Sequence, residues 1–307
     1  MFVCDDSKYI IHFYVNYRLK GRLRMTLNDE EYLLKSRLKN FGQKEFSFLE
    51  CSVVMPNCIE SLLNNIGTID SELRDNLIYM TFARWITSGQ LSVDIMLHIK
   101  NTIMDTTHMF YRIGEKNNDT VFTRSFSVLF IPLLLERNKQ QAFMQPNELT
   151  EIQEKILLYI KEEKDLRGFV ENKGWAHALA HTADAIHAIS VCNHLSAQQS
   201  MRFLDAIKNA ICTKQVVYTN LEEERLVTAV VSLIAQNKLS DKEIENWISR
   251  FLIWDKTEVW NEEYKIIFNI KSFLGSLYFR IHKRNEFSCT ARVIEDRLHT
   301  FMQSYIS

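Results

Sequence analysis

The 307-residue sequence is poor in glycine and proline, with 8 and 3 residues respectively. Proteins on average contain about 7% glycine and about 5% proline, and these two residues form many of the tight turns between β-strands. A chain with so few of them cannot make the many turns that an all-β fold needs. We therefore predict an all-α protein.

Long apolar runs and an excess of one charge are also missing. The longest apolar run, Val128 to Leu135, is far shorter than the roughly 20 residues that cross a bilayer, so we predict no membrane span. The net charge is -1, from 37 Lys and Arg against 38 Asp and Glu. Without a positive excess, the composition disfavours nucleic acid as a partner.

The six cysteines form no Cys-x-x-Cys pair, and most lie among apolar neighbours. This pattern indicates reduced thiols in a protein core. The first residues place Asp5 and Asp6 where a secretory signal has a basic start and an apolar run. We therefore expect a cytoplasmic protein.

Capping pairs mark several helix starts, because a short polar side chain accepts from a free amide while Glu or Gln three residues later returns the bond. Four pairs fit: Asn28/Glu31, Ser196/Gln199, Asn220/Glu223 and Ser240/Glu243. The apolar spacing predicts about a dozen helices, over residues 29–41, 45–66, 70–88, 91–113, 119–139, 147–164, 174–193, 196–213, 220–237, 240–253, 260–283 and 288–305.

Helix pairs recur at a spacing near the roughly 40 to 47 residues of irregular helical repeats. This favours an αα-superhelix, an irregular helical-repeat solenoid, over a compact helical bundle, although both architectures bury one stripe per helix. We expect residues 25–307 to form one such domain. The first 24 residues are aromatic and basic, and we interpret them as an extension before a natural start at Met25 that is poorly ordered, rather than as a basic arm for nucleic acid.

The most informative stretch runs from Lys173 to Asp184, in which His177, His181 and Asp184 recur at i, i+4 and i+7. On the predicted helix 174–193 these three side chains point the same way. Such groups are costly to bury alone, so the stripe indicates a hydrogen-bonded network, a ligand pocket or a metal site. As metal ligands they would suit a divalent ion such as zinc, but Ala178 stands where helical zinc proteases have a catalytic Glu.

Other residues extend the pocket interpretation. Trp175 offers either a flat wall for a ligand or ordinary core packing. Three arginines lie near acids or aromatics and are expected either to face the same cavity or to form structural ion pairs: Arg74 within Asp70 to Asp75, Arg124 within Phe122 to Ser127, and Arg225 within Glu222-Glu223-Glu224-Arg225.

These motifs together resemble the bacterial domain of unknown function 2785 family. The resemblance covers roughly residues 45 to 305, and it implies a bacterial, cytoplasmic, all-helical protein without an activity to transfer. The motifs, in order, are Asp70 to Asp75, Arg124-Ser125-Phe126-Ser127, Arg167-Gly168-Phe169-Val170, Lys173-Gly174-Trp175-Ala176-His177, Ala180-His181, Ala183-Asp184 and Glu224-Arg225-Leu226.

The sequence shows no phosphate-binding glycine loop, nucleophile elbow or nucleotide fingerprint. We therefore predict a binding or interaction protein with a polar pocket around His177, His181 and Asp184. Its partner is a protein or a small molecule, and no cofactor is required. The alternative is a metal-dependent hydrolase in which these three residues hold the metal and Glu223 or Glu224 is the general base.

Overall fold

The computed structural model describes residues 27–42, 47–55, 57–192, 195–254, 256 and 258–306. The chain divides into two units, residues 1–45 and residues 46–307. Within the first unit the structure describes helix α2 (Leu27–Gly42), where a helix over 29–41 was predicted. The expected extension, residues 1–24, lies outside the described residues.

Most of the second unit is helical, which confirms the all-α prediction. Its short strands form one two-stranded antiparallel hairpin. In chain order the elements are α3 (Phe48–Val54), α4 (Cys58–Asn64), η1 (Glu72–Tyr79), α5 (Met80–Thr87), α6 (Val93–Ile103), α7 (Thr120–Gln140), α8 (Pro146–Glu162), β1 (Phe169–Val170), β2 (Gly174–Trp175), α9 (Ala178–Cys192), α10 (Ala197–Ile211), α11 (Glu222–Ile234), α12 (Asp241–Ser249), η2 (Arg250–Leu252), α13 (Trp260–Ile281), η3 (Asn285–Phe287) and α14 (Ser288–Ile306).

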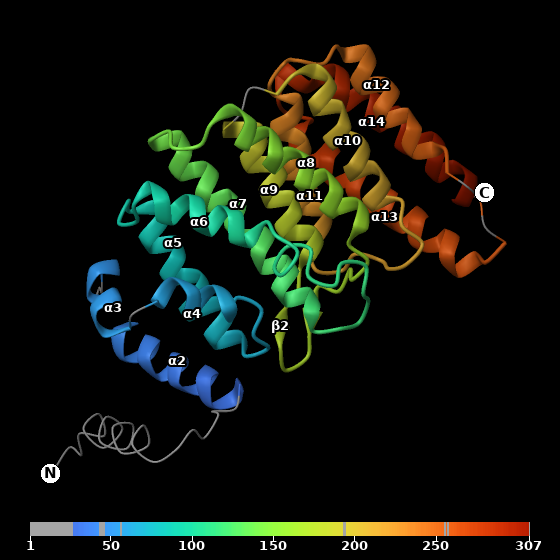
Figure 1. The fold of residues 1–307 in the computed structure, drawn as a ribbon. Helices are drawn as coiled ribbons and strands as arrows, with labels where there is room; N and C mark the ends of the chain where they lie inside the picture. The colour runs from blue at the N-terminus through green and yellow to red at the C-terminus, as the bar shows by residue number, and fades with distance from the viewer. Residues whose placement is uncertain are drawn as a thin grey trace, which may run out of the picture. The chain divides into compact units, whose positions relative to one another are not determined.

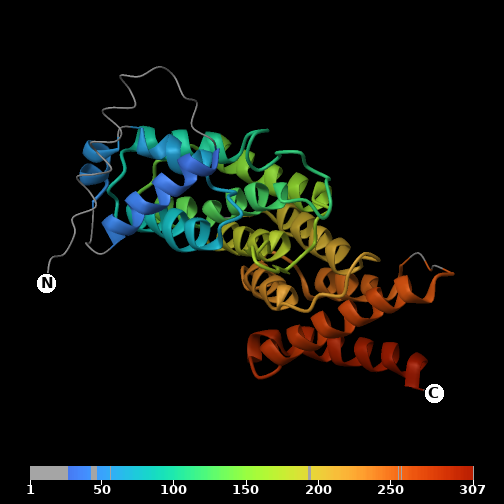
Figure 2. The same cartoon turned by 90° about the horizontal axis from the view of Figure 1, so that it is seen from below.

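Alternate helices of the second unit pack side by side. Helices α7, α9, α11 and α13 form one row, in which each contacts the next (Figure 1). Helix α8 packs against α9 and α10, and α10 packs against α11. At the C-terminal end, α13 and α14 lie against each other (Figure 2). The αα-superhelix stays a prediction, which this alternation supports.

Three predicted helices differ from the structure. The predicted helix 45–66 is two helices, α3 and α4, because Pro56 follows Met55, and a residue before proline is driven to extended backbone. Met55 accordingly has φ -131° and ψ 80°. The predicted helix 91–113 ends at Ile103 and continues as turns. The predicted helix 174–193 begins only at Ala178.

Two of the predicted capping pairs are confirmed. Ser196 and Ser240 each form a reciprocal capping box with the residue three positions later. The pair at Asn220 and Glu223 is wrong, because the helix α11 begins at Glu222 after Leu221, whose φ is 63°. Within the described part of the chain, no helix is both long and apolar enough to cross a membrane.

Candidate functional site

The hairpin of β1 and β2 precedes α9 and is fixed against the segment around Arg74. The Nη2 atom of Arg74 donates to the carbonyl oxygen of Lys173 at 2.8 Å. Gly174 has φ +81°, and a Cβ there would lie 2.9 Å from Cβ of Ser71 and 3.1 Å from Nη2 of Arg74. Only glycine meets both demands, so the backbone of the hairpin can lie directly on this segment.

His177 joins the hairpin to α9 and lies outside the helix, which corrects the predicted single stripe. Its φ is 46°, a left-handed conformation that is uncommon outside glycine. The carbonyl oxygen of His177 accepts from the amide of His181 at 2.9 Å, and its own amide donates to the carbonyl of Arg167 at 3.2 Å. The two imidazole rings still lie edge to face, with centroids 6.1 Å apart.

The imidazole of His177 lies under the indole of Trp175. The two rings are stacked, with centroids 4.3 Å apart, and Trp175 is 42% exposed. The Nε2 atom of His177 is buried and has no hydrogen-bond partner among the described residues. Burial, together with the nearby Arg225, lowers the pKa of His177 to about 4. The ring is therefore neutral at pH 7.

His181 is buried on the first turn of α9, and its tautomer follows from its contacts. The Nδ1 atom lies 3.1 Å from the carbonyl oxygen of Ser125. A carbonyl only accepts, so Nδ1 carries the proton and Nε2 keeps the lone pair. Burial above all, with the adjacent His177, lowers the pKa of His181 to about 3. The second imidazole is also a neutral acceptor.

Asp184 and Arg225 connect α9 to α11. The Nη1 atom of Arg225 lies 3.3 Å from Oδ1 of Asp184, and the Arg225 side chain is 54% exposed. Burial raises the pKa of Asp184 to about 6, although Arg225 opposes the shift. At neutral pH the carboxylate is mostly ionised, and the half-exposed guanidinium keeps donors free toward solvent.

Glu222 is a buried acid near His177, and the sequence analysis gave it no role of its own within the segment Glu222 to Arg225. Its Oε1 atom lies 4.0 Å from Nε2 of His177, beyond hydrogen-bond distance. Its Oε2 atom accepts from the amide of Asn220 at 2.8 Å. A Cβ at Gly168 would lie 2.5 Å from Oε1 of Glu222, so the glycine makes room for this acid. Burial raises the pKa of Glu222.

We call Trp175, His177, His181, Asp184, Glu222 and Arg225 the histidine cluster. Of the predicted site residues, Glu224 does not belong to it. One oxygen of Glu224 accepts from Arg280 on α13 at 2.6 Å. Glu223 also faces α13, because its Oε1 atom accepts from Ser272 at 3.2 Å. Neither residue is placed to act as a base at the two histidines.

Arg74 is buried next to the hairpin and has a structural role. Its guanidinium carbon lies 4.3 Å from the ring centre of Phe122 and 4.7 Å from that of Phe126. Its Nε atom lies 2.9 Å from Oδ1 of Asp75. Burial lowers the pKa of Arg74, and Asp75 opposes the shift. The residue supports the hairpin through Lys173 and is fully enclosed.

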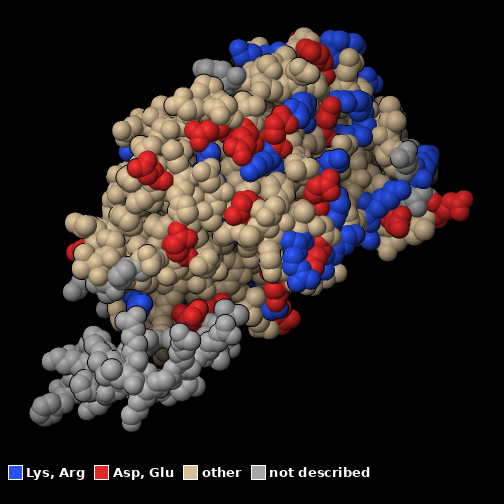
Figure 3. Space-filling view, in the orientation of Figure 1, with Lys and Arg blue, Asp and Glu red and all other residues tan. Residues whose placement is uncertain are grey.

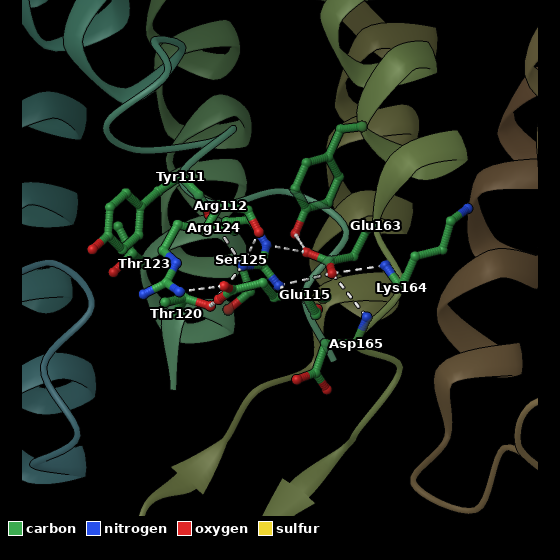
Figure 4. Close-up of polar contacts among 12 residues, drawn as sticks. Tyr111, Arg112, Glu115, Thr120, Thr123, Arg124, Ser125, Glu163, Lys164 and Asp165 are labelled. Carbon is green, nitrogen blue, oxygen red and sulfur yellow. Dashed lines mark hydrogen bonds and ion pairs between the residues drawn. The ribbon is translucent and has the colours of Figure 1, made fainter. Parts of the chain in front are cut away.

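Arg124 belongs to a separate buried network. It donates from Nε and Nη2 to the two oxygens of Glu163, at 2.6 and 2.9 Å. It also donates to the carbonyl of Tyr111 at 3.1 Å, while the hydroxyl of Tyr159 donates to Glu163 at 3.0 Å. Figure 4 shows this network between α7 and the end of α8. The predicted need of Arg124 for an acidic partner is met by Glu163.

The predicted metal set is not assembled. Across the described residues, no group of three or more His, Cys, Asp or Glu side chains is arranged to hold a metal ion. His177 lies before helix α9 with a left-handed backbone, and Asp184 forms an ion pair with Arg225. The donors therefore do not fit a zinc site of three protein ligands.

The buried neutral histidines predict a pH-dependent stability. The pKa of His181 is about 3 in the fold against an ordinary 6.5, so the unfolded chain takes up a proton first as the pH falls. The stability that His181 contributes above about pH 6.5 is then lost as the pH falls, by about 2 kcal/mol between pH 7 and pH 5. His177, with its pKa of about 4, adds a loss of similar size. Asp184, with its raised pKa, changes in the opposite direction and offsets about 1 kcal/mol.

Urea unfolding at pH 7 and pH 5 measures this effect. The pH-dependent loss is expected to be smaller by about 2 kcal/mol in His181→Ala than in the parent. An equal loss in both proteins would show that the pKa of His181 is the same in the folded and unfolded chain.

Comparison with family models gives a match over more than half of the chain. A family model described as "Protein of unknown function (DUF2785)" matches residues 109–279. The matched region contains the whole histidine cluster and Arg124, and it begins after Arg74. Neither curated proteins nor solved structures give a match.

Proposed function

The chain belongs to the DUF2785 family of proteins of unknown function, and because that description names no activity, we propose from the site itself that the histidine cluster binds a small polar ligand. The observation that carries this proposal is the buried, unpartnered Nε2 atom of His177. Leaving such an atom unpaired costs about 1 to 3 kcal/mol. A bound ligand would remove that cost.

The chemistry of the cluster favours a polyhydroxy acid. His181 presents a lone pair on Nε2 and Asp184 a carboxylate, and both accept hydrogen bonds from hydroxyl groups. Arg225 is half exposed and contacts Asp184 through Nη1, which leaves other N–H groups for a ligand carboxylate. Trp175 supplies a partly exposed apolar wall. A polyhydroxy acid matches these features, because its hydroxyls can donate to His181 and Asp184, its carboxylate can pair with Arg225, and its carbon skeleton can pack against Trp175.

The proposal also includes the architecture of the protein and its cell compartment. We infer a helical-repeat protein of the bacterial cytoplasm, because rows of alternate helices are typical of such repeats. The described cysteines, Cys51, Cys58, Cys192, Cys212 and Cys289, are free thiols. A reducing compartment maintains thiols in that state.

Thermal melting in the presence of candidate acids tests the binding proposal. At 100 times its Kd, a ligand adds about 2.7 kcal/mol of stability, which raises the Tm of a domain of this size by about 5 to 10 °C. We expect gluconate or glucuronate at 10 mM to stabilise the parent. The same acid should leave the Tm of His177→Ala and Arg225→Ala unchanged.

Glu224→Gln is the matched control, because Glu224 precedes Arg225 on α11 but pairs with Arg280. It should respond to the acid as the parent does. No shift with either acid, or an equal shift in His177→Ala, would contradict the proposal. The metal-dependent hydrolase has no observation in its favour among the described residues.

A further inference from the structure

A cavity of about 450 Å³ lies between α8, α9, α10 and the segment 213–218. Helix α9 contributes Ala178, Leu179 and Thr182 to its wall. At about 100° per residue, these three lie on a different side of α9 from His181 and Asp184. The cavity is therefore separate from the histidine cluster, and its volume falls within the roughly 300 to 1,000 Å³ of small-molecule sites.

Much of the cavity wall is apolar. Leu157 and Ile160 come from α8, Leu166 from the segment after it, and Ala206 from α10. Together with Leu179, these side chains offer an aliphatic surface between the two helices. Such a surface favours the hydrocarbon part of a ligand, because its burial removes apolar area from water.

The acids of the wall are already neutralised. Both oxygens of Glu163 accept from Arg124, and Asp205 on α10 is paired with Arg250. The guanidinium of Arg202 in turn contacts Glu154, with Nη2 2.7 Å from Oε2. These pairs leave little net charge, so the remaining ionic groups of the wall decide its preference.

Two lysines remain, Lys161 and Lys164. The ammonium of Lys164 donates to the backbone carbonyl of Lys161 and is paired with no acid in the described structure. Lys161 is 3.6 Å from Glu162 and its side chain is 77% exposed. In Figure 4 the Lys164 side chain extends away from the Arg124 network. Figure 3 shows Lys and Arg side chains, interspersed with Asp and Glu, over the part of the surface with α8, α10 and the C-terminal helices.

We propose that this cavity binds a small carboxylate with an aliphatic body, such as a medium-chain fatty acid. The carboxylate meets Lys164 and Lys161 at the mouth, and the chain lies against Leu157, Ile160 and Leu179. A cation beside an apolar wall whose acids are already paired selects for an anionic amphiphile over a neutral or cationic one. The site does not depend on the ligand of the histidine cluster.

Calorimetric titration of the full chain with octanoate tests the proposal, with octanol and octylamine as comparators of equal chain length. We expect saturable one-to-one binding of octanoate, weaker binding of octanol and none of octylamine. Lys164→Glu should weaken octanoate binding by about tenfold or more and leave octanol unchanged. Ala206→Phe, which fills part of the cavity, should weaken both.

Two control variants locate the binding at this cavity. Lys139→Glu makes the same charge change on α7, which contributes no residue to the cavity wall, and should bind octanoate as the parent does. His177→Ala should also bind it normally, whatever becomes of the polar ligand. The proposal would be overturned if octanoate did not bind saturably, if Lys164→Glu bound it as the parent does, or if octylamine bound equally well. The result with Lys164→Glu is sufficient for this test even if Ala206→Phe does not fold.

Discussion

Replacing Arg124 by alanine is expected to lower the free energy of unfolding by about 3 to 5 kcal/mol, the cost of removing one partner of a buried ion pair. Arg124 is fully buried and makes two charge-assisted bonds to Glu163. The substitution leaves the carboxylate without a counter-ion and leaves the carbonyl of Tyr111 without this donor. Urea unfolding at pH 7 measures the loss.

Arg202→Ala is the matched control, because Arg202 also binds a carboxylate with both Nη atoms, but on the surface. An exposed pair contributes at most about 1 kcal/mol. The double substitution of Arg124 by Met and Glu163 by Leu should recover part of the loss, since no unpaired charge remains. A loss below about 1 kcal/mol for Arg124→Ala would mean that water enters this network.

Replacement by alanine is expected to destabilise the protein at His181 but not at His177. His181→Ala removes the bond to the Ser125 carbonyl and the edge contact with Phe126, whose ring centre lies 5.2 Å away. It should cost about 1 to 3 kcal/mol. His177→Ala removes a buried nitrogen that has no partner among the described residues, and this gain offsets the lost stacking on Trp175. Its Tm should stay close to that of the parent.

Calorimetric melts of the parent and both variants at pH 7 test this difference, and Trp175→Ala separates the stacking contribution from that of the nitrogen. A large loss of thermal stability in both histidine variants would mean that the two residues have a structural role only. A large loss in His177→Ala alone would mean that its Nε2 atom has a partner in solution, such as water.

The helical elements were largely predictable from local sequence. Scarce breakers and regular apolar spacing gave α7, α10 and α13 nearly at their observed ends, because amphipathic periodicity extends along each whole helix. The hairpin before α9 was not predictable in this way. Its conformation depends on left-handed backbone at Asn172, Gly174 and His177, and apolar spacing carries no information on such residues.

The site was predictable in part. The approach of His177 to His181 and of Asp184 to Arg225 was anticipated, because the first three lie within one short stretch of sequence. The structure places Glu222, rather than Glu224, near His177, since Leu221 adopts φ 63° at the start of α11. Glycine at position 168, which leaves room for that acid, was the one signal available. Its meaning required knowledge of the packing.

The bond from Arg74 to the Lys173 carbonyl links residues 99 positions apart, and this has a consequence for folding. Closing so long a loop costs entropy before any contact repays it, and long-range contacts slow folding. Helices α9 and α11, which pack against each other, are closer together in the sequence than Arg74 and Lys173 are. We therefore expect the hairpin to dock after these helices, and a growing polypeptide can complete the histidine cluster only once α11, which carries Glu222 and Arg225, has been synthesised.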